Sequence, residues 1–116
     1  MMPPSTHKPA FDRNAALARV GGDTVLLKEL AELFREECPR SLIQLHLALE
    51  RQDPKGVQNA AHGLKGAVSN FGAEPAMDAA LCLERLGREA HLDEAREALA
   101  DLEQALATLQ TELADL

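Results

Sequence analysis

The chain has 116 residues, enough for one domain with a single modest hydrophobic core. Its net charge of −7 argues against a nucleic-acid partner, because proteins that bind nucleic acids need a basic face. Leu and Ala dominate, Trp and Tyr are absent and only three Phe occur, which favours helices over a β sandwich. No apolar run approaches the roughly 20 residues of a membrane span.

Residues 1–10 contain three prolines together with Ser, Thr and Lys. Such a composition is typical of a disordered or extended tail or of a linker. The stretch lacks the apolar core of a signal peptide, so we expect a cytoplasmic protein. The folded domain is therefore expected to cover residues 11–116.

The sequence offers no pattern for a bound metal or cofactor. Cys38 and Cys82 lie far apart inside predicted helices, so we expect free thiols in a reducing compartment. No Cys/His cluster has the spacing of a zinc site. Neither a carboxylate cluster nor a Gly-rich phosphate loop is present, so tight binding of Mg²⁺ or ATP is not expected.

A short helix over residues 13–20 is expected to open the domain. Asp12 is placed to cap its amino end, with Phe11 as a hydrophobic staple. Gly21-Gly22 should end the helix, because glycine tolerates the left-handed conformation that follows many helices.

A long helix over residues 24–51 follows, with Asp23 as its cap. Pro39 interrupts this helix: its ring removes one hydrogen bond and clashes with the carbonyl of Arg35, which predicts a kink or a break into two helices. The apolar pattern resumes in phase at Leu42, which favours the kink. The residues expected on its buried side are Leu26 or Leu27, Leu30, Leu33, Phe34, Leu42, Leu45 and Leu49.

The third helix, expected over residues 54–71, has two unlike faces. Asp53 and Pro54 provide a cap and a first-turn proline. Two glycines in its middle, at positions 63 and 66, each cost about 1 kcal/mol relative to Ala, so this helix is not built for stability alone. At 100° per residue the apolar stripe comprises Val57, Ala61, Leu64, Val68 and Phe71, and the opposite face carries His62, Lys65, Gly66 and Ser69.

His62 gives this polar face a nucleophile. A neutral imidazole nitrogen exposed on a helix could accept a group from a partner protein. Lys65, one turn further on, could meet a phosphoryl anion, and Gly66 removes side-chain bulk so that another protein can come close. The alternative is a solvated helix face with an incidental histidine, which this combination of residues disfavours.

A fourth helix over residues 75–90 should pack closely against the third, because Ala76, Ala79 and Ala80 lie on its inner side with Leu83 and Leu86. An antiparallel turn around Gly72 places His62 opposite residues 83–85. Glu84 could then accept a hydrogen bond from Nδ1 and leave Nε2 free as the nucleophile, unless it is an ordinary solvated glutamate. Arg85 and Arg88 could edge the docking face.

The fifth helix, over residues 92–113, carries an unbroken heptad-like seam. The seam fits either a coiled-coil dimer or the fourth wall of an antiparallel bundle. Because three other helices have apolar stripes to cover, we expect an all-α monomer: an antiparallel up-down four-helix bundle preceded by a short N-terminal helix. The seam comprises Leu92, Ala95, Leu99, Leu102, Leu106, Leu109, Leu113 and Leu116.

The string His62-x-Leu64-Lys65-Gly66, followed by Asn70-x-Gly72-Ala73, resembles the signature of histidine-containing phosphotransfer (HPt) domains. The resemblance extends over roughly residues 11–116. Its further landmarks are Phe11-Asp12, Val20-Gly21-Gly22-Asp23, Glu29-Leu30 to Phe34, Glu37-x-Pro39-x-x-Leu42 and Leu83-Glu84.

This resemblance implies a helical bundle that relays phosphoryl groups between proteins and has no kinase activity of its own. His62 would be the phosphoacceptor, assisted by Lys65, with Glu84 at the place of a Glu or Gln in HPt proteins. The implied partners are response-regulator receiver domains and a sensor histidine kinase, including kinases of the hybrid type. The receiver would supply the aspartate and the Mg²⁺. The expected partner-binding residues are Gly66, Ser69, Asn70, Arg85 and Arg88.

Two other classes of function fit the sequence less well. An interaction module could dock receiver or kinase domains without passing phosphate, but a replaced histidine would be its sign, and His62 is present. An enzyme with His62 as general base would need a cleft and a second catalytic group. A histidine on the convex face of a bundle has neither, which disfavours the enzyme.

Overall fold

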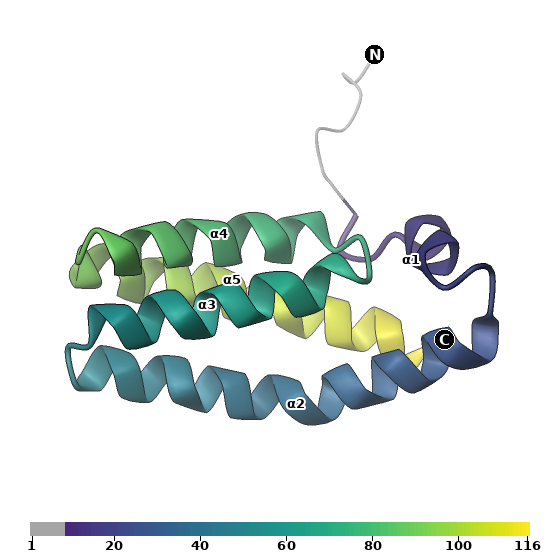
Figure 1. Cartoon of the computed structure of the whole chain (residues 1–116), viewed down its shortest axis with the longest axis horizontal. Coiled ribbons are helices and arrows are strands. Elements are labelled where there is room, and N and C mark those ends of the chain that lie inside the picture. Colours follow the sequence, from purple (N-terminus) through teal and green to yellow (C-terminus); the bar gives the residue numbers. More distant parts are fainter. Residues whose placement is uncertain (1–8) are drawn as a thin grey trace, which may run out of the picture.

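The computed structural model describes residues 9–116, so most of the tail expected over residues 1–10 lies outside the described part. Within that part the regular elements are all helices, which confirms the predicted all-α class (Figure 1). None of these helices is long and apolar enough to cross a membrane. In chain order they are α1 (Arg13–Arg19), α2 (Thr24–Glu50), α3 (Pro54–Ser69), α4 (Glu74–Arg88) and α5 (Leu92–Ala114).

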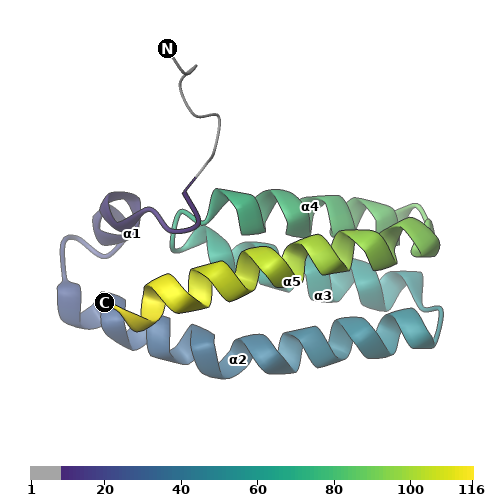
Figure 2. The ribbon, with the colours of Figure 1, turned by 180° about the vertical axis from the view of Figure 1, so that it is seen from behind.

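Helices α2 to α5 form the expected antiparallel up-down bundle, and α1 lies across one end of it against α2 (Figures 1 and 2). The closest pairing is between α3 and α4; α3 also packs on α2, and α5 packs on α4 and α2. Figure 1 shows α3 in front of α5, whereas Figure 2, the view from behind, shows α5 in front of α3. These two helices therefore lie on opposite faces of the bundle.

Aspartate caps start the first three helices, as their sequence positions predict. The carboxylates of Asp12, Asp23 and Asp53 each accept a hydrogen bond of 3.0 Å from a backbone N–H three residues further on. Gly21-Gly22 adopts the left-handed conformation expected at the end of α1, with φ of +63° and +79°. Observed helix ends differ from the predicted ones by one or two residues, which is the usual uncertainty of a fraying terminus.

The turn between α3 and α4 is locked onto the start of the domain. Gly72 has a φ of +58°, and a Cβ at this position would lie 2.9 Å from the Cβ of Asp12. The backbone N–H of Asp12 donates to the carbonyl of Phe71 at 3.1 Å. The ring of Phe71 packs against Phe34 of α2 and Phe11, with centroids 5.4 and 6.4 Å apart. These contacts fix the turn that sets the register of α3 against α4.

Helix α2 corrects two details of the sequence analysis. It continues through Pro39, so the alternative of two separate helices is wrong. Leu33, expected inside, is 54% exposed, and of the pair at positions 26 and 27 it is Leu27 that is buried. The reason is that Ala31 and Cys38 continue the buried stripe that begins at Leu27, whereas a stripe drawn through the larger leucines lies on a different side of the helix.

The α5 seam is buried in its own bundle. From Ala95 to Leu113 every seam residue is buried, while Leu92 and Leu116 at the two ends are half-buried. The seam thus forms the fourth wall of the core, as predicted. An intermolecular coiled coil would need this same stripe, which the bundle already covers.

Helices α3 and α4 approach closely because of one glycine that the sequence analysis did not single out. A Cβ on Gly87 would lie 2.7 Å from the backbone nitrogen of Gln58 and 3.1 Å from the carbonyl oxygen of Pro54. Only a residue without a side chain fits there. Together with Ala76 and Ala80, both fully buried, Gly87 lets the two backbones come together beside the polar face of α3.

Candidate functional site

His62 stands on the outward side of α3, with its side chain 68% exposed. The opposite side of the helix is anchored in the core, because Val57, Ala61, Leu64 and Val68 are at most 2% exposed. The imidazole is therefore carried on a rigid element and remains open to a partner of protein size.

Glu84 of α4 holds the ring of His62. The Nδ1 atom lies 3.1 Å from Oε1 and 3.3 Å from Oε2 of this carboxylate. An ionised carboxylate only accepts hydrogen bonds, so Nδ1 carries the proton and donates it. In the neutral ring the lone pair is then on Nε2. The alternative of a solvated glutamate is wrong, because Glu84 is only 8% exposed.

Lys65 shares the same carboxylate. Its Nζ lies 2.8 Å from Oε1 and 3.5 Å from Oε2 of Glu84. The hydrogen bond from Lys65 lowers the pKa of Glu84; burial opposes this shift, and the hydrogen bond from His62 adds to it. Glu84 therefore stays ionised at neutral pH. One carboxylate thus orients an imidazole and an ammonium at the same point of the surface.

The next turn of α3 places a residue without a side chain, Gly66, beside this site. A Cβ on Gly66 would meet no atom within 4 Å, so packing inside the chain does not require glycine there. Ser69 donates its hydroxyl proton to the carbonyl of Gly66 at 2.6 Å, which leaves the hydroxyl oxygen available as an acceptor. Asn70 is the exposed C-cap of α3.

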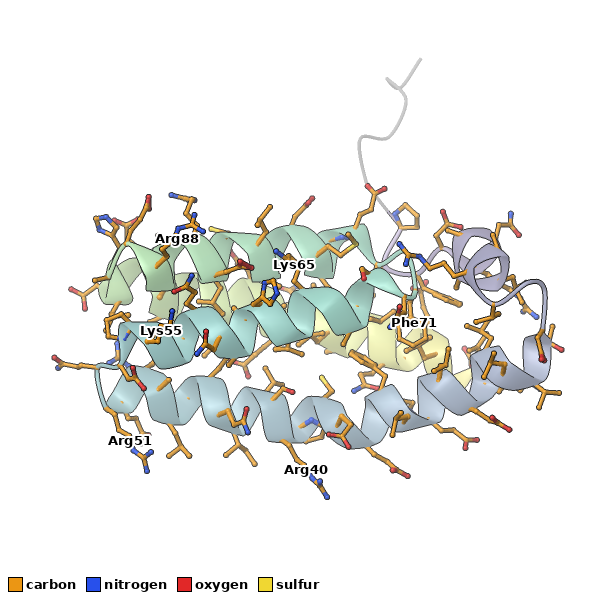
Figure 3. All side chains as sticks on the ribbon, viewed as in Figure 1. Arg40, Arg51, Lys55, Lys65, Phe71 and Arg88 are labelled. Carbon is orange, nitrogen blue, oxygen red and sulfur yellow. The ribbon has the colours of Figure 1, made fainter. Side chains whose placement is uncertain are left out.

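The two arginines predicted to edge the site are placed differently. Arg85 forms an ion pair of 3.3 Å with Glu89 along α4. Arg88, one turn beyond Glu84, is exposed and is seen in Figure 3 on the same face of the molecule as Lys65. Arg88 thus carries an exposed positive charge on this face.

Two exposed residues on the same helix faces as the site were not predicted from the sequence. Leu81 is 52% exposed on α4, one turn before Glu84. Lys55 is exposed on α3, two turns before His62. The signal was their spacing of three and seven residues from the site residues, which places them on the same helix faces. Leu81 presents an exposed apolar side chain and Lys55 an exposed positive charge.

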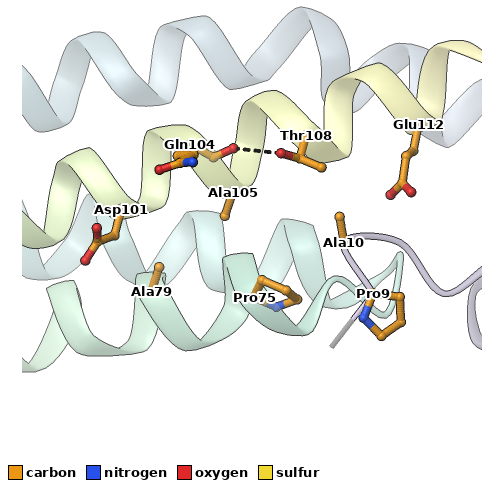
Figure 4. Close-up of a pocket in the computed structure, with 9 residues that line it drawn as sticks. All are labelled: Pro9, Ala10, Pro75, Ala79, Asp101, Gln104, Ala105, Thr108 and Glu112. Atoms are coloured by element: carbon orange, nitrogen blue, oxygen red, sulfur yellow. Dashed lines mark hydrogen bonds between the residues drawn. The ribbon is translucent and has the colours of Figure 1, made fainter. Parts of the chain in front are cut away.

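A hollow of the bundle lies away from this site. It measures about 500 Å³ and is lined by residues of both α4 and α5, among them Ala79 and Ala105 (Figure 4). Neither His62 nor Glu84 lines it. Residues 9–116 contain no group of three or more His, Cys, Asp or Glu side chains placed to hold a metal ion.

Comparison with known proteins identifies the class. The family model of the Hpt domain matches residues 29–112, so the chain belongs to the family of histidine-containing phosphotransfer domains, the phosphocarriers of phosphorelays. The fold is similar to the crystal structure of histidine-containing phosphotransfer protein B (HptB) from Pseudomonas aeruginosa PAO1, with a TM-score of 0.86 and 23% identity over 94% of this chain and 95% of that one. Comparison with curated proteins gave no match.

Proposed function

We propose that His62 accepts a phosphoryl group from the aspartyl phosphate of a receiver domain and passes it to a second receiver. The observation that carries this proposal is the bond between Nδ1 and Glu84, which leaves the Nε2 lone pair facing solvent on a rigid helix. Nε2 forms a bond to phosphorus as the acyl P–O bond breaks, and the receiver keeps the electron pair as its carboxylate.

Charge balance assigns roles to the two neighbours of His62. Attack by the neutral ring, with its proton kept on Nδ1, leaves a positive charge on the imidazole, which the carboxylate of Glu84 stabilises. Lys65 then offsets the charge of the phosphoryl oxygens. Phosphoryl transfer depends on positioning and charge neutralisation more than on covalent machinery, and the receiver contributes its own Mg²⁺.

The partners follow from the same geometry. His62 lies on an open helix face, which suits another folded domain as the donor better than a small substrate. We assign Gly66, Ser69, Asn70, Arg85 and Arg88 to the surface that this domain covers. The relay would connect a sensor histidine kinase, including kinases of the hybrid type, with response-regulator receivers in the cytoplasm. This chain would act in it as a monomeric carrier without kinase activity.

Label transfer tests the acceptor. The chain is incubated with a receiver phosphorylated with ³²P, and acid-labile label on the chain is measured. His62→Gln should abolish the label while the helical circular dichroism stays unchanged, because the side chain is exposed. The matched controls His46→Gln and His91→Gln should keep it.

Two results would contradict the proposal. Label that persists on the His62→Gln variant would exclude this residue as the acceptor. Binding of phosphorylated receivers by the unmodified chain without any label would instead favour the alternative of a docking module that passes no phosphate.

A further inference from the structure

The face around His62 is basic although the chain as a whole is acidic. Helix α3 carries Lys55 and Lys65 and no Asp or Glu, in a protein of net charge −7. Figure 3 shows both lysines and Arg88 on one face. Lys65 is paired with Glu84, whereas Lys55 and Arg88 are exposed and form no ion pair or hydrogen bond with any residue in the described range 9–116.

One further arginine, Arg51 at the C-cap of α2, lies on the α2 side of α3. Arg51 lines a hollow of about 370 Å³ between α2 and α3, together with Leu47 and Asn59. In Figure 3 the side chains of Arg40 and Arg51 project from the edge of α2 that is turned away from α3, so they do not add to the charge directly around His62. Asp53 also lines the hollow, but its carboxylate is engaged as the cap of α3.

The opposite face is acidic. Helix α5 has Arg96 as its single basic residue, and the Arg96 guanidinium donates to the carbonyl of Leu49 at 3.0 Å. Because α5 lies behind α3, positive and negative charge are separated across the thickness of the bundle (Figures 1 and 2). The acidic residues of α5 are Asp93, Glu94, Glu97, Asp101, Glu103 and Glu112.

We infer that this charge separation steers an acidic protein surface onto His62 and repels it from α5. The inference rests on the proposed function and names the chemistry of the partner: a receiver whose carboxylates surround the phosphorylated aspartate. Such a site must gather carboxylates to hold Mg²⁺, and its surface is therefore negative. Nucleic acid, the other polyanion, is disfavoured by the net charge.

Electrostatic steering acts on the rate of association. Complementary charge raises association rates by about 10- to 1,000-fold over the uncharged case, and the gain fades once the ionic strength shortens the Debye length to about 10 Å or less. Lys55 on α3 and Arg88 on α4 both lie toward the same end of the bundle as seen from Lys65, and neither forms an ion pair or hydrogen bond with Glu84 (Figure 3). They should therefore affect the encounter with the receiver and leave the geometry of the nucleophile intact.

Two double variants with equal net charge separate the face from the total charge. Lys55→Gln/Arg88→Gln removes positive charge near His62. Gln104→Glu/Ala107→Glu adds the same negative charge on exposed positions of α5. The association rate constant with a phosphorylated receiver is measured by stopped flow at low and at high salt.

The first variant should associate roughly tenfold more slowly at low salt and at nearly the unmodified rate at high salt, whereas the α5 variant should match the unmodified chain at both. Equal slowing of both variants would assign the effect to total charge and overturn the inference. So would an association rate of the unmodified chain that does not change with salt.

Two further measurements keep this inference apart from the proposed function. Label transfer by the unmodified chain at high salt and saturating receiver tests the acceptor alone; absence of label there would refute the proposed function. Duplex DNA serves as a probe for the other polyanion. DNA binding that exceeds receiver binding and is lost in Lys55→Gln/Arg88→Gln would assign the basic face to nucleic acid and overturn the inference.

Discussion

Glu84 is the residue on which the geometry of the site depends. Its carboxylate accepts from Nδ1 of His62 at 3.1 Å and from Nζ of Lys65 at 2.8 Å, and both bonds end on Oε1. The ring is thereby held in one tautomer, and the ammonium is held within reach of the same surface point. In a phosphorylated chain the phosphoryl oxygens would compete with Glu84 for Lys65, so the two anions share one cation.

The tautomer of His62 should depend on the acceptor at position 84. In the unmodified chain Nδ1 carries the proton, because it faces a carboxylate. Glu84→Gln keeps an acceptor oxygen and should keep this tautomer, whereas Glu84→Ala should release the ring to a mixture of tautomers. The ¹⁵N chemical shifts of the neutral ring distinguish the two forms. A single, unchanged tautomer in Glu84→Ala would show that the hydrogen bond does not orient the ring.

Acid should weaken the contribution of Glu84 to stability. Its pKa in the folded chain lies below the ordinary value of 4.5, chiefly because Lys65 donates to it. A lowered folded-state pKa gives stability that is fully present above pH 4.5 and is lost as the pH falls through the folded value. The difference in unfolding free energy between the unmodified chain and Glu84→Gln should therefore be larger at pH 7 than at pH 3.

Urea unfolding at the two pH values measures this difference, and Glu97→Gln on α5 is the control. Glu97 is exposed and without an ion pair among residues 9–116, so its replacement should change stability little at either pH. A stability difference for Glu84→Gln that is the same at pH 3 and pH 7 would show that the lowered pKa does not contribute to folding.

At the scale of the elements, the pairing of α3 with α4 brings the site together. Gly72, in the turn that follows α3, has a φ of +58° and fixes the register, and Gly87 lets the backbones approach. The register explains why His62 on one helix meets Glu84 on the other. A shift of either helix by one residue would rotate these side chains away from each other.

Two helical glycines should respond to alanine in opposite ways. A Cβ on Gly87 would lie 2.7 Å from the backbone nitrogen of Gln58, so Gly87→Ala should force α3 and α4 apart and cost about 1–3 kcal/mol. Gly63 has no atom within 4 Å of the added Cβ, so Gly63→Ala should stabilise the chain by up to about 1 kcal/mol. Thermal unfolding measures both. A stabilised Gly87→Ala variant would contradict the close approach described here.

The sequence predicts the pairing of helices better than it predicts their facing sides. The turn at Gly72 and the caps at Asp12, Asp23 and Asp53 are local signals, which need no knowledge of the neighbours. The burial of Leu27 rather than Leu33 is different, because it depends on where α5 and α3 lie around α2. Small residues such as Ala31 and Cys38 contribute little to a hydrophobic pattern, although they continue the buried stripe.

In the candidate site, too, contacts that depend on a neighbouring helix are harder to predict from the sequence than local signals. The antiparallel register was enough to place Glu84 opposite His62. The bond from Lys65 to Glu84 was not foreseen, because a long side chain one turn away can reach either a neighbouring carboxylate or solvent. Gly87 also escaped notice, since a glycine inside a helix acquires a meaning only once the backbone that approaches it is known.

At the scale of the whole molecule, different helices of the bundle close the core and carry the reactive face. The core is closed by α5, whose seam residues Leu102, Leu106 and Leu109 are at most 1% exposed. Helix α3 contributes the reactive face and α5 the acidic one, on opposite sides of the bundle (Figures 1 and 2). The heptad pattern of α5 therefore serves the interior of one chain, and its polar side is left to solvent.

The burial of the α5 seam predicts a monomer. If α5 closes the core of its own chain, unfolding involves one molecule, and the thermal midpoint should not change with protein concentration. Leu106→Ala should lower the free energy of unfolding by about 2–5 kcal/mol at every concentration, because it leaves a cavity in a fully packed core. Calorimetry over a hundredfold range of concentration, with sedimentation of the native chain, measures both quantities. A midpoint that rises with concentration, together with sedimentation as a dimer, would mean that the seam of α5 also joins two chains.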